Sequence, residues 1–245
     1  MSNPHIIAVF VAWAIAGCTG QPRSSGPERQ TMTRFRGTLH VDDAPIRGAD
    51  LFLLDRAAKV VAATRSDELG SWELPAPAGW SGGSLLAKLY EPIAGARAIP
   101  LGVDDQVLDV RVRSADAVTL SGDIAWPADV KPDWVEVSIT PRQLDGIPAE
   151  AKLALLAVDT GPALRGTYLA KRATEPRFQF RVLPGTWDLR VIRNVDAPPE
   201  SLQIPNLEQV SLTLPDGSHP ALTVGFYRLE VRHDLHVQVT LAVAR

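Results

Sequence analysis

The sequence predicts an all-β protein built from two consecutive β-sandwich domains, which follow a cleaved signal peptide and a flexible tether. The first observation is the content of 20 prolines and 18 glycines in 245 residues, because both residues interrupt helices and mark turns. The second is that the apolar segments beyond the amino terminus are shorter than the ~10–12 residues expected of a helix. The third is that turn-forming residues separate these segments at the spacing of a sandwich.

The amino terminus has the pattern of an export signal. Residues 6–16, IIAVFVAWAIA, form an apolar run that would span about 16 Å as a helix, too short for the ~30 Å core of a bilayer. The run is therefore interpreted as the apolar region of a secretory signal peptide. Ile15, Ala16 and Gly17 precede Cys18, which is the only cysteine of the chain. The alternative is a buried free cysteine that follows a short core strand.

These residues resemble the lipobox of bacterial lipoproteins. The resemblance implies cleavage after residue 17 and acylation of Cys18 with chains such as palmitate, which would anchor the protein on a membrane. Thr19 stands where, by the same resemblance, an aspartate would favour retention in an inner membrane. We therefore expect the outer membrane of a bacterial cell envelope, on its periplasmic or surface face. Residues 18–33 lack apolar periodicity and are expected to form a tether that reaches roughly 20 Å.

Residues 34–114 are expected to form the first sandwich. Short apolar segments alternate here with the turn signals APIRG, SDELG, PAPAG and EPIAG. The expected strands are FRGTLHV (35–41), ADLFLL (49–54), KVVAAT (59–64), SWEL (71–74), SLLAKLY (84–90) and VLDVRV (107–112). Asp67 can accept hydrogen bonds from turn amides, Gly70 can adopt a positive φ, and Trp72 and Leu74 share one strand face. We therefore expect a hairpin here that closes on a core.

The same region resembles the carboxypeptidase regulatory-like, or transthyretin-like, domain over about eighty residues. The resemblance implies a prealbumin-like Greek-key β-sandwich and an accessory module that lacks the zinc site of the peptidases. The matching positions are Gly37, Pro45, Gly48, Ala49, Thr64, Asp67, Gly70, Trp72, Leu74 and Gly79.

Residues 117–245 are expected to repeat this plan more loosely, with the boundary near residues 114–116. Gly122 corresponds to Gly37, and Val137 and Ile139 correspond to Phe52 and Leu54. The stretch RFQFRVLPGTWDLRVIR (177–193) sets two apolar strands on either side of Pro-Gly, and LHVQVTLAVAR (235–245) would be the closing strand. Insertions are expected near 142–172 and 193–220.

The motifs that could carry catalysis or a metal are interpreted as structural. Ser81 lies in the pentad GWSGG (79–83), but a nucleophile elbow needs a helix after the serine, whereas strand-like LLAKLY follows here. His233 and His236 are three apart in an expected strand, so they would point to opposite faces, one exposed and one packed. The pairs Asp42–Asp43 and Asp104–Asp105 lack the spacing of a calcium loop and are expected in turns.

The six tryptophans divide into two groups outside the signal. Trp72 and Trp187 lie on apolar strand faces and are expected in the core. Trp80, Trp126 and Trp134 neighbour glycine or proline in expected loops, where exposed rings could contact a ligand. Packing against the ends of the sandwiches is the competing interpretation, since tryptophan is highly buried on average.

The sequence therefore predicts a lipid-anchored, non-enzymatic binding or scaffold protein with no cofactor, no metal and no catalytic residue. Its net charge of −3 provides no basic surface for nucleic acid. The expected partners are the membrane, through Cys18, and a protein or glycan. The alternatives are a carbohydrate- or peptidoglycan-binding module that uses the loop tryptophans and, less favoured, a serine hydrolase that uses Ser81.

Overall fold

The computed structural model describes residues 33–125, 134–151, 169–173, 175–194, 210–223 and 225–241. These residues form β-strands almost throughout, joined by turns and two short 3-10 helices, η1 (Ser114–Asp116) and η2 (Ala149–Ala151). The all-β prediction is confirmed. Cys18, Trp126 and the predicted signal peptide lie outside the described residues. Among the described residues, no helix is long and apolar enough to cross a membrane.

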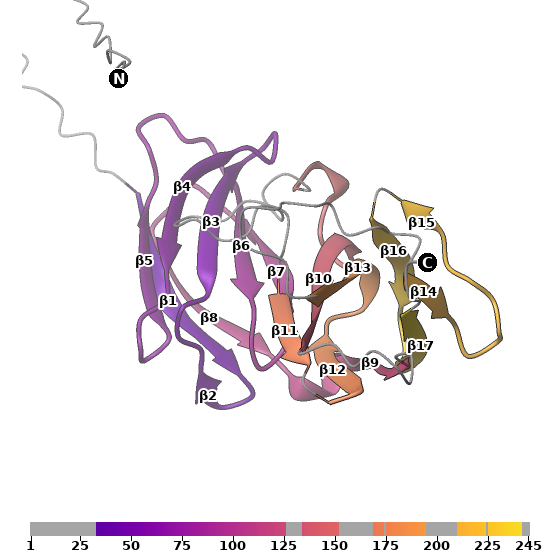
Figure 1. Ribbon diagram of the computed structural model, residues 1–245. Helices are drawn as coiled ribbons and strands as arrows, with labels where there is room; N and C mark the ends of the chain where they lie inside the picture. The colour runs from indigo at the N-terminus through magenta and orange to yellow at the C-terminus, as the bar shows by residue number, and fades with distance from the viewer. Residues whose placement is uncertain are drawn as a thin grey trace, which may run out of the picture. The chain divides into compact units, whose positions relative to one another are not determined.

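Two facing sheets make up residues 34–112 (Figure 1). In one sheet, β1 (Arg34–Val41) pairs antiparallel with β5 (Ser71–Pro75) and the short β2 (Ala44–Pro45), and parallel with β8 (Gln106–Val112). The other sheet has the antiparallel order β4 (Val60–Arg65), β3 (Asp50–Asp55), β6 (Gly83–Leu89), β7 (Gly95–Leu101). A core that includes Phe35, Leu39, Leu51, Leu53, Trp72, Leu74, Leu85 and Val110 lies between them.

The six strands predicted in this region are all present, with bounds within one residue of those expected. Two additional strands are present, the short β2 and β7, which the pattern of apolar segments did not indicate. Asp67 performs the expected role, since its Oδ1 accepts the amides of Leu69 and Ser71 at 2.9 and 2.8 Å, and Gly70 has φ +73°. The expected hairpin is wrong in one respect. β4 and β5 belong to different sheets, so this turn connects the two layers.

Residues 118–241 contribute two further sheets. The first has the order β12 (Arg177–Val182), β9 (Val118–Ala125), β17 (Leu235–Leu241), β14 (Val210–Thr213). The second has the order β11 (Leu169–Ala173), β10 (Trp134–Leu144), β13 (Gly185–Asn194), β16 (Phe226–Val231), β15 (Leu222–Thr223). The strands on either side of Pro184–Gly185 belong to different sheets, so this turn also connects two layers.

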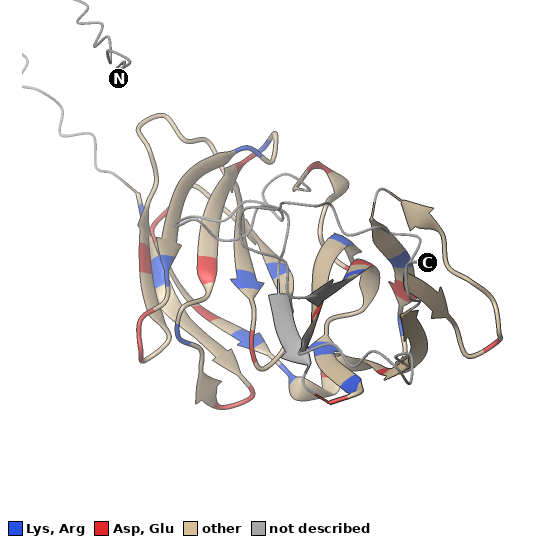
Figure 2. Ribbon diagram, viewed as in Figure 1, with Lys and Arg blue, Asp and Glu red and all other residues tan. Residues whose placement is uncertain are grey.

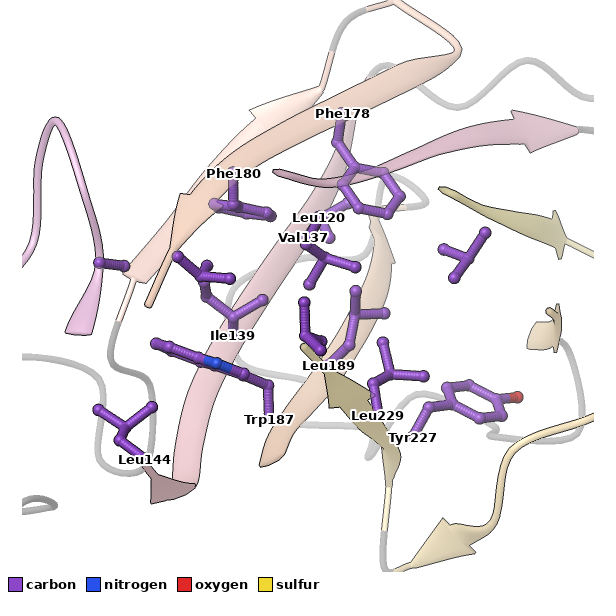
Figure 3. Close-up of a cluster of buried hydrophobic side chains, with 14 of the residues drawn as sticks. Leu120, Val137, Ile139, Leu144, Phe178, Phe180, Trp187, Leu189, Tyr227 and Leu229 are labelled. Atoms are coloured by element: carbon purple, nitrogen blue, oxygen red, sulfur yellow. The ribbon is translucent and has the colours of Figure 1, made fainter. Parts of the chain in front are cut away.

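The pairing pattern of the second half repeats that of the first. β9 pairs antiparallel with β12 and parallel with β17, as β1 pairs with β5 and β8. Gly37 lies opposite Trp72 and Leu108, and Gly122 lies opposite Phe178 and Val237. Figure 3 shows the core that results, in which the side chains of Phe178, Phe180 and Leu120 point toward those of Val137, Ile139 and Leu189.

The two halves share buried surface. Strand β3 is buried on both faces, because Leu51 and Leu53 belong to the core of the first half, whereas Phe52 and Leu54 belong to the cluster of the second. The backbone of Ala94 also forms hydrogen bonds with Arg181 and Leu183 at 2.8 and 2.9 Å. Residues 32–245 form one compact unit. The division into domains 34–114 and 117–245 stays a prediction.

Candidate functional site

A cleft of about 650 Å³ is formed by four segments that are far apart in the sequence. Its walls come from the β3–β4 turn, the segment before β6, the end of β7 and the segment after β10. The lining residues are Asp55, Arg56, Ala58, Ser81, Gly82, Gly83, Ser84, Ala98, Pro100, Leu101, Gly102, Val103, Gly146, Pro148 and Glu150. This volume lies within the ~300–1,000 Å³ range of small-ligand sites.

The β3–β4 turn places Arg56 at this cleft. The Oδ1 atom of Asp55 accepts the amides of Ala57 and Lys59, each at 2.9 Å, and Ala58 adopts a left-handed φ of 58°. A Cβ atom added to Gly82 would lie 3.7 Å from Nε and Nη2 of Arg56. The guanidinium therefore lies against the backbone of Gly82. Among the described residues, it has no hydrogen-bond or ion-pair partner.

Ser81 lies in this cleft and is exposed. Strand β6 begins at Gly83, so a strand and not a helix follows the pentad, and no histidine is among the described lining residues. Among the described residues that line the cleft, Ser81 therefore has neither the elbow nor the histidine base that a serine nucleophile needs. Its interpretation as a loop residue fits this geometry.

A serine, a histidine and an aspartate do meet elsewhere, on the outer face of the β12-β9-β17-β14 sheet. Oγ of Ser121 lies 3.1 Å from Nδ1 of His236, whose Nε2 lies 3.0 Å from Oδ2 of Asp123. The side chains of His236 and Asp123 are 56% and 59% exposed, so water surrounds the group. A preorganised site for electrostatic catalysis excludes water, and this group does not. No local sequence pattern indicates this group, because it results from the parallel pairing of β9 with β17.

The expectation for the two histidines is partly wrong. His233 lies in the bend between β16 and β17, and both His233 and His236 are exposed. The described residues contain no group of three or more His, Cys, Asp or Glu side chains that could hold a metal ion. Asp42, Asp43 and Asp104 lie in turns or bends, as expected.

The first half contains a buried charged cluster on the face of β3 and β6 that points away from its own core. Asp50 accepts hydrogen bonds from Nε and Nη2 of Arg65, at 2.9 and 2.7 Å, and from the hydroxyl of Tyr90. Lys88 lies directly across from Asp50, with Nζ 5.5 Å from the centre of the Phe52 ring. Burial lowers the pKa of Lys88 to about 8, against the opposing effect of Asp50. Burial and the bond to Asp50 raise the pKa of Tyr90.

Trp72 and Trp187 lie in the core as predicted, whereas Trp80 packs against the core, as in the competing interpretation. Trp72 and Trp187 are 5% and 0% exposed, and Nε1 of Trp187 donates to the carbonyl of Leu183 at 3.1 Å. Trp80 is half-buried, and its ring packs edge-on against Phe35 at 5.1 Å between centroids. Trp134 begins β10 and not a loop, and its side chain lies outside the described residues.

Charged side chains of both signs are interspersed along the two halves (Figure 2). The ion pairs include Arg97 with Asp116 at 2.8 Å and Arg232 with Asp145 at 2.8 Å. Most of these pairs are exposed and contribute little to stability.

Neither a scan against protein-family models nor a search of curated proteins found a match. Among solved structures, the chain is similar to the Bacillus anthracis TIE protein, with 10% identity, a TM-score of 0.26, and coverage of 86% of this chain and 33% of that one. It is also similar to a streptococcal ancillary pilin, with 14% identity, a TM-score of 0.27, and coverage of 88% and 64%. A DUF3823 family protein from Bacteroides ovatus has 8% identity and a TM-score of 0.26, with coverage of 86% and 100%. The chain thus spans less than two thirds of the first two proteins, and at these TM-scores the similarities carry no inference about function.

Proposed function

We propose that this chain is a lipid-anchored, non-enzymatic binding or scaffold protein of the bacterial cell envelope. It would display its β-sandwich domains at the surface of the outer membrane. The observation that carries the proposal is the sequence around Cys18, the only cysteine, which follows an apolar run and small residues in the manner of a lipobox. Acylation of Cys18 would hold the protein on the membrane, and residues 18–33 would separate the folded part from the lipid.

Two features of the described residues support a binding role. The sheets provide a rigid framework with buried cores, and the loops form a cleft of ligand size. We further propose that residues 34–114 form a carboxypeptidase regulatory-like domain and residues 117–245 a second sandwich. The matching pairing patterns of the two halves support this division.

The anchor is tested by metabolic labelling with radioactive palmitate in a bacterium with two membranes, followed by detergent phase partitioning. The wild-type chain is expected to carry label and to enter the detergent phase. Cys18→Ala is expected to lose the label, because no thiol remains to be acylated. Unlabelled wild-type protein in the aqueous phase would refute the anchor.

The choice of membrane is tested with Thr19→Asp in the same cells. Separation of the two membranes on a density gradient should place wild-type protein in the outer membrane and the variant in the inner membrane. Thr19→Ser is the matched control, and it should fractionate with the wild type. An inner-membrane location of the wild type would contradict the proposed outer-membrane location but not the proposed lipid anchor.

A further inference from the structure

We propose that the cleft beside Ser81 binds a short peptide by its free carboxylate, with Arg56 as the group that receives it. This inference rests on the proposed binding function and deepens it, because it names the class of ligand that the cleft would bind. It does not depend on the lipid anchor.

Arg56 is the first reason. Arg56 is exposed at the wall of the cleft, its guanidinium lies against Gly82, and within the described part of the chain it has no ion-pair partner. A guanidinium presents a planar set of donors that matches a carboxylate in a bidentate arrangement, which adds both strength and specificity. Ser81 and Ser84 also line the cleft, and their hydroxyl groups can donate to the same anion.

The charge of the lining disfavours a phosphate more than it disfavours a carboxylate. Arg56 contributes one positive charge, whereas Asp55 and Glu150 contribute two negative charges. A group with nearly two negative charges is therefore repelled more strongly than a group with one. The two carboxylates can instead accept hydrogen bonds from the amides or amino group of the same ligand.

The rest of the wall favours a peptide over a sugar. Gly102 and Gly146 contribute bare backbone, and Leu101, Val103 and Pro148 contribute apolar surface for side chains. A Cβ atom added to Gly146 would meet nothing within 4 Å, so the space beside it is open. No aromatic ring is among the described lining residues, whereas stacking on a sugar needs such a ring. Capture of a terminal carboxylate is also a known mode of peptide recognition.

The test uses the full chain in detergent micelles and a mixture of tetrapeptides that is randomised at its first three positions. The mixture is prepared with a free terminal carboxylate and, separately, with a terminal carboxamide. Retention on the immobilised protein, followed by calorimetry of the retained peptides, is expected to favour the acid at least about tenfold, as for a charge-assisted hydrogen bond. Equal binding of the two forms, or binding of neither, would overturn the proposal.

The variants separate the role of Arg56 from general effects of charge. Arg56→Gln is expected to remove the preference for the acid, and Arg56→Lys to retain only part of it, because the planar donor set is lost. Arg36→Gln removes an exposed arginine on β1, outside the cleft, and is expected to bind as the wild type. Unchanged binding by Arg56→Gln, with thermal unfolding the same as in the wild type, would contradict the assignment.

Two other anions and one anchor variant complete the design. Oligogalacturonate and inorganic phosphate are expected to compete at least about tenfold more weakly than the acid peptides. Stronger competition by either would overturn the assignment to a peptide carboxylate. Cys18→Ala should bind the peptides as the wild type does, so a failure of the anchor and a failure of the cleft give different results.

Discussion

The two halves of the chain pair their strands in the same order, and in each half a glycine lies where three strands approach closely. The halves differ in how much space a Cβ atom would have at that glycine. In the first half, a Cβ atom at Gly37 would overlap the carbonyl oxygen of Leu108 on the parallel strand. In the second half, a Cβ atom at Gly122 would lie 2.6 Å from the carbonyl oxygen of Val237 and from the Phe178 ring. Close approach of three strands at one point therefore requires glycine in both halves, with less room in the first.

The largest expected effect comes from breaking this point of closure. Gly37→Ala should destabilise the protein by roughly 4 kcal/mol or more, because backbone atoms must move. Gly122→Ala should cost about 2–3 kcal/mol, since part of its clash is with a side chain that can shift. Urea unfolding of both variants measures the difference. The reverse order of the two effects would show that the first half is not the tighter one.

The shared core provides the second test of the comparison. Phe52 points away from the core of its own half and into the cluster of the second half, whereas its neighbour Leu53 points into its own core. Phe52→Ala should therefore cost about 3–4 kcal/mol, as much as Leu53→Ala. The measurement is again the free energy of unfolding in urea. A cost below about 1 kcal/mol for Phe52→Ala would mean that the halves do not bury this surface together.

The third test uses the buried charged side chains, Lys88 in the first half and Asp188 in the second. Lys88 has a pKa near 8 in the folded protein, below its ordinary value of 10.5, whereas Asp188 in the second half is paired with Arg142 and Arg228. Between these two values the unfolded chain binds more protons than the folded one, so stability rises with pH. We expect a gain of about 2 kcal/mol between pH 8 and pH 10.

Tyr90 limits, at its upper end, the pH range in which stability rises. Its raised pKa means that the folded chain retains a proton that the unfolded chain loses, so its contribution falls as pH increases beyond about 10. Lys88→Met is the control, and urea unfolding at each pH should show that the gain has disappeared. If the gain persists in this variant, the effect does not come from Lys88.

The smallest expected effect concerns two turn residues with similar backbone conformations. Ala58 has φ 58° in the first half, and Gly146 has φ 78° after β10 in the second. Ala58→Gly should stabilise the protein by up to about 1 kcal/mol, and Gly146→Ala should destabilise it by about 1 kcal/mol. Thermal unfolding of the two variants should shift in opposite directions, and shifts of the same sign would contradict the argument.

The strands of the first half could be predicted because short apolar segments and turn signals are local features. β7 could not, because Ala96, Arg97 and Pro100 give it neither alternation nor high strand propensity. Proline is tolerated there because β7 is the last strand of its sheet among the described residues. Strand β16 was not predicted although FYRLEV alternates in burial; it lies between the expected insertion near 193–220 and the predicted closing strand at 235–245.

The candidate site was less predictable because it depends on pairing between distant segments. Ser81 is recognisable as a candidate from its Gly-x-Ser-x-Gly motif, but no local pattern indicates that Arg56 and Glu150 line the same cleft. The contact of His236 with Ser121 has the same origin, since it requires β17 to lie beside β9. The turn that carries Arg56 is a local feature and can be predicted from the sequence. The surface opposite the turn is formed by distant segments and cannot.

The parallel pairing of the first and last strand of each half has a mechanical consequence. Tension between Arg34 and Val112, at opposite ends of the β1–β8 pair, would act along the strands. The backbone hydrogen bonds of the pair would then bear the load together, whereas peeling a hairpin open breaks them one after another. The β9–β17 pair has the same geometry, so each half should resist stretching along its strands better than pulling across them.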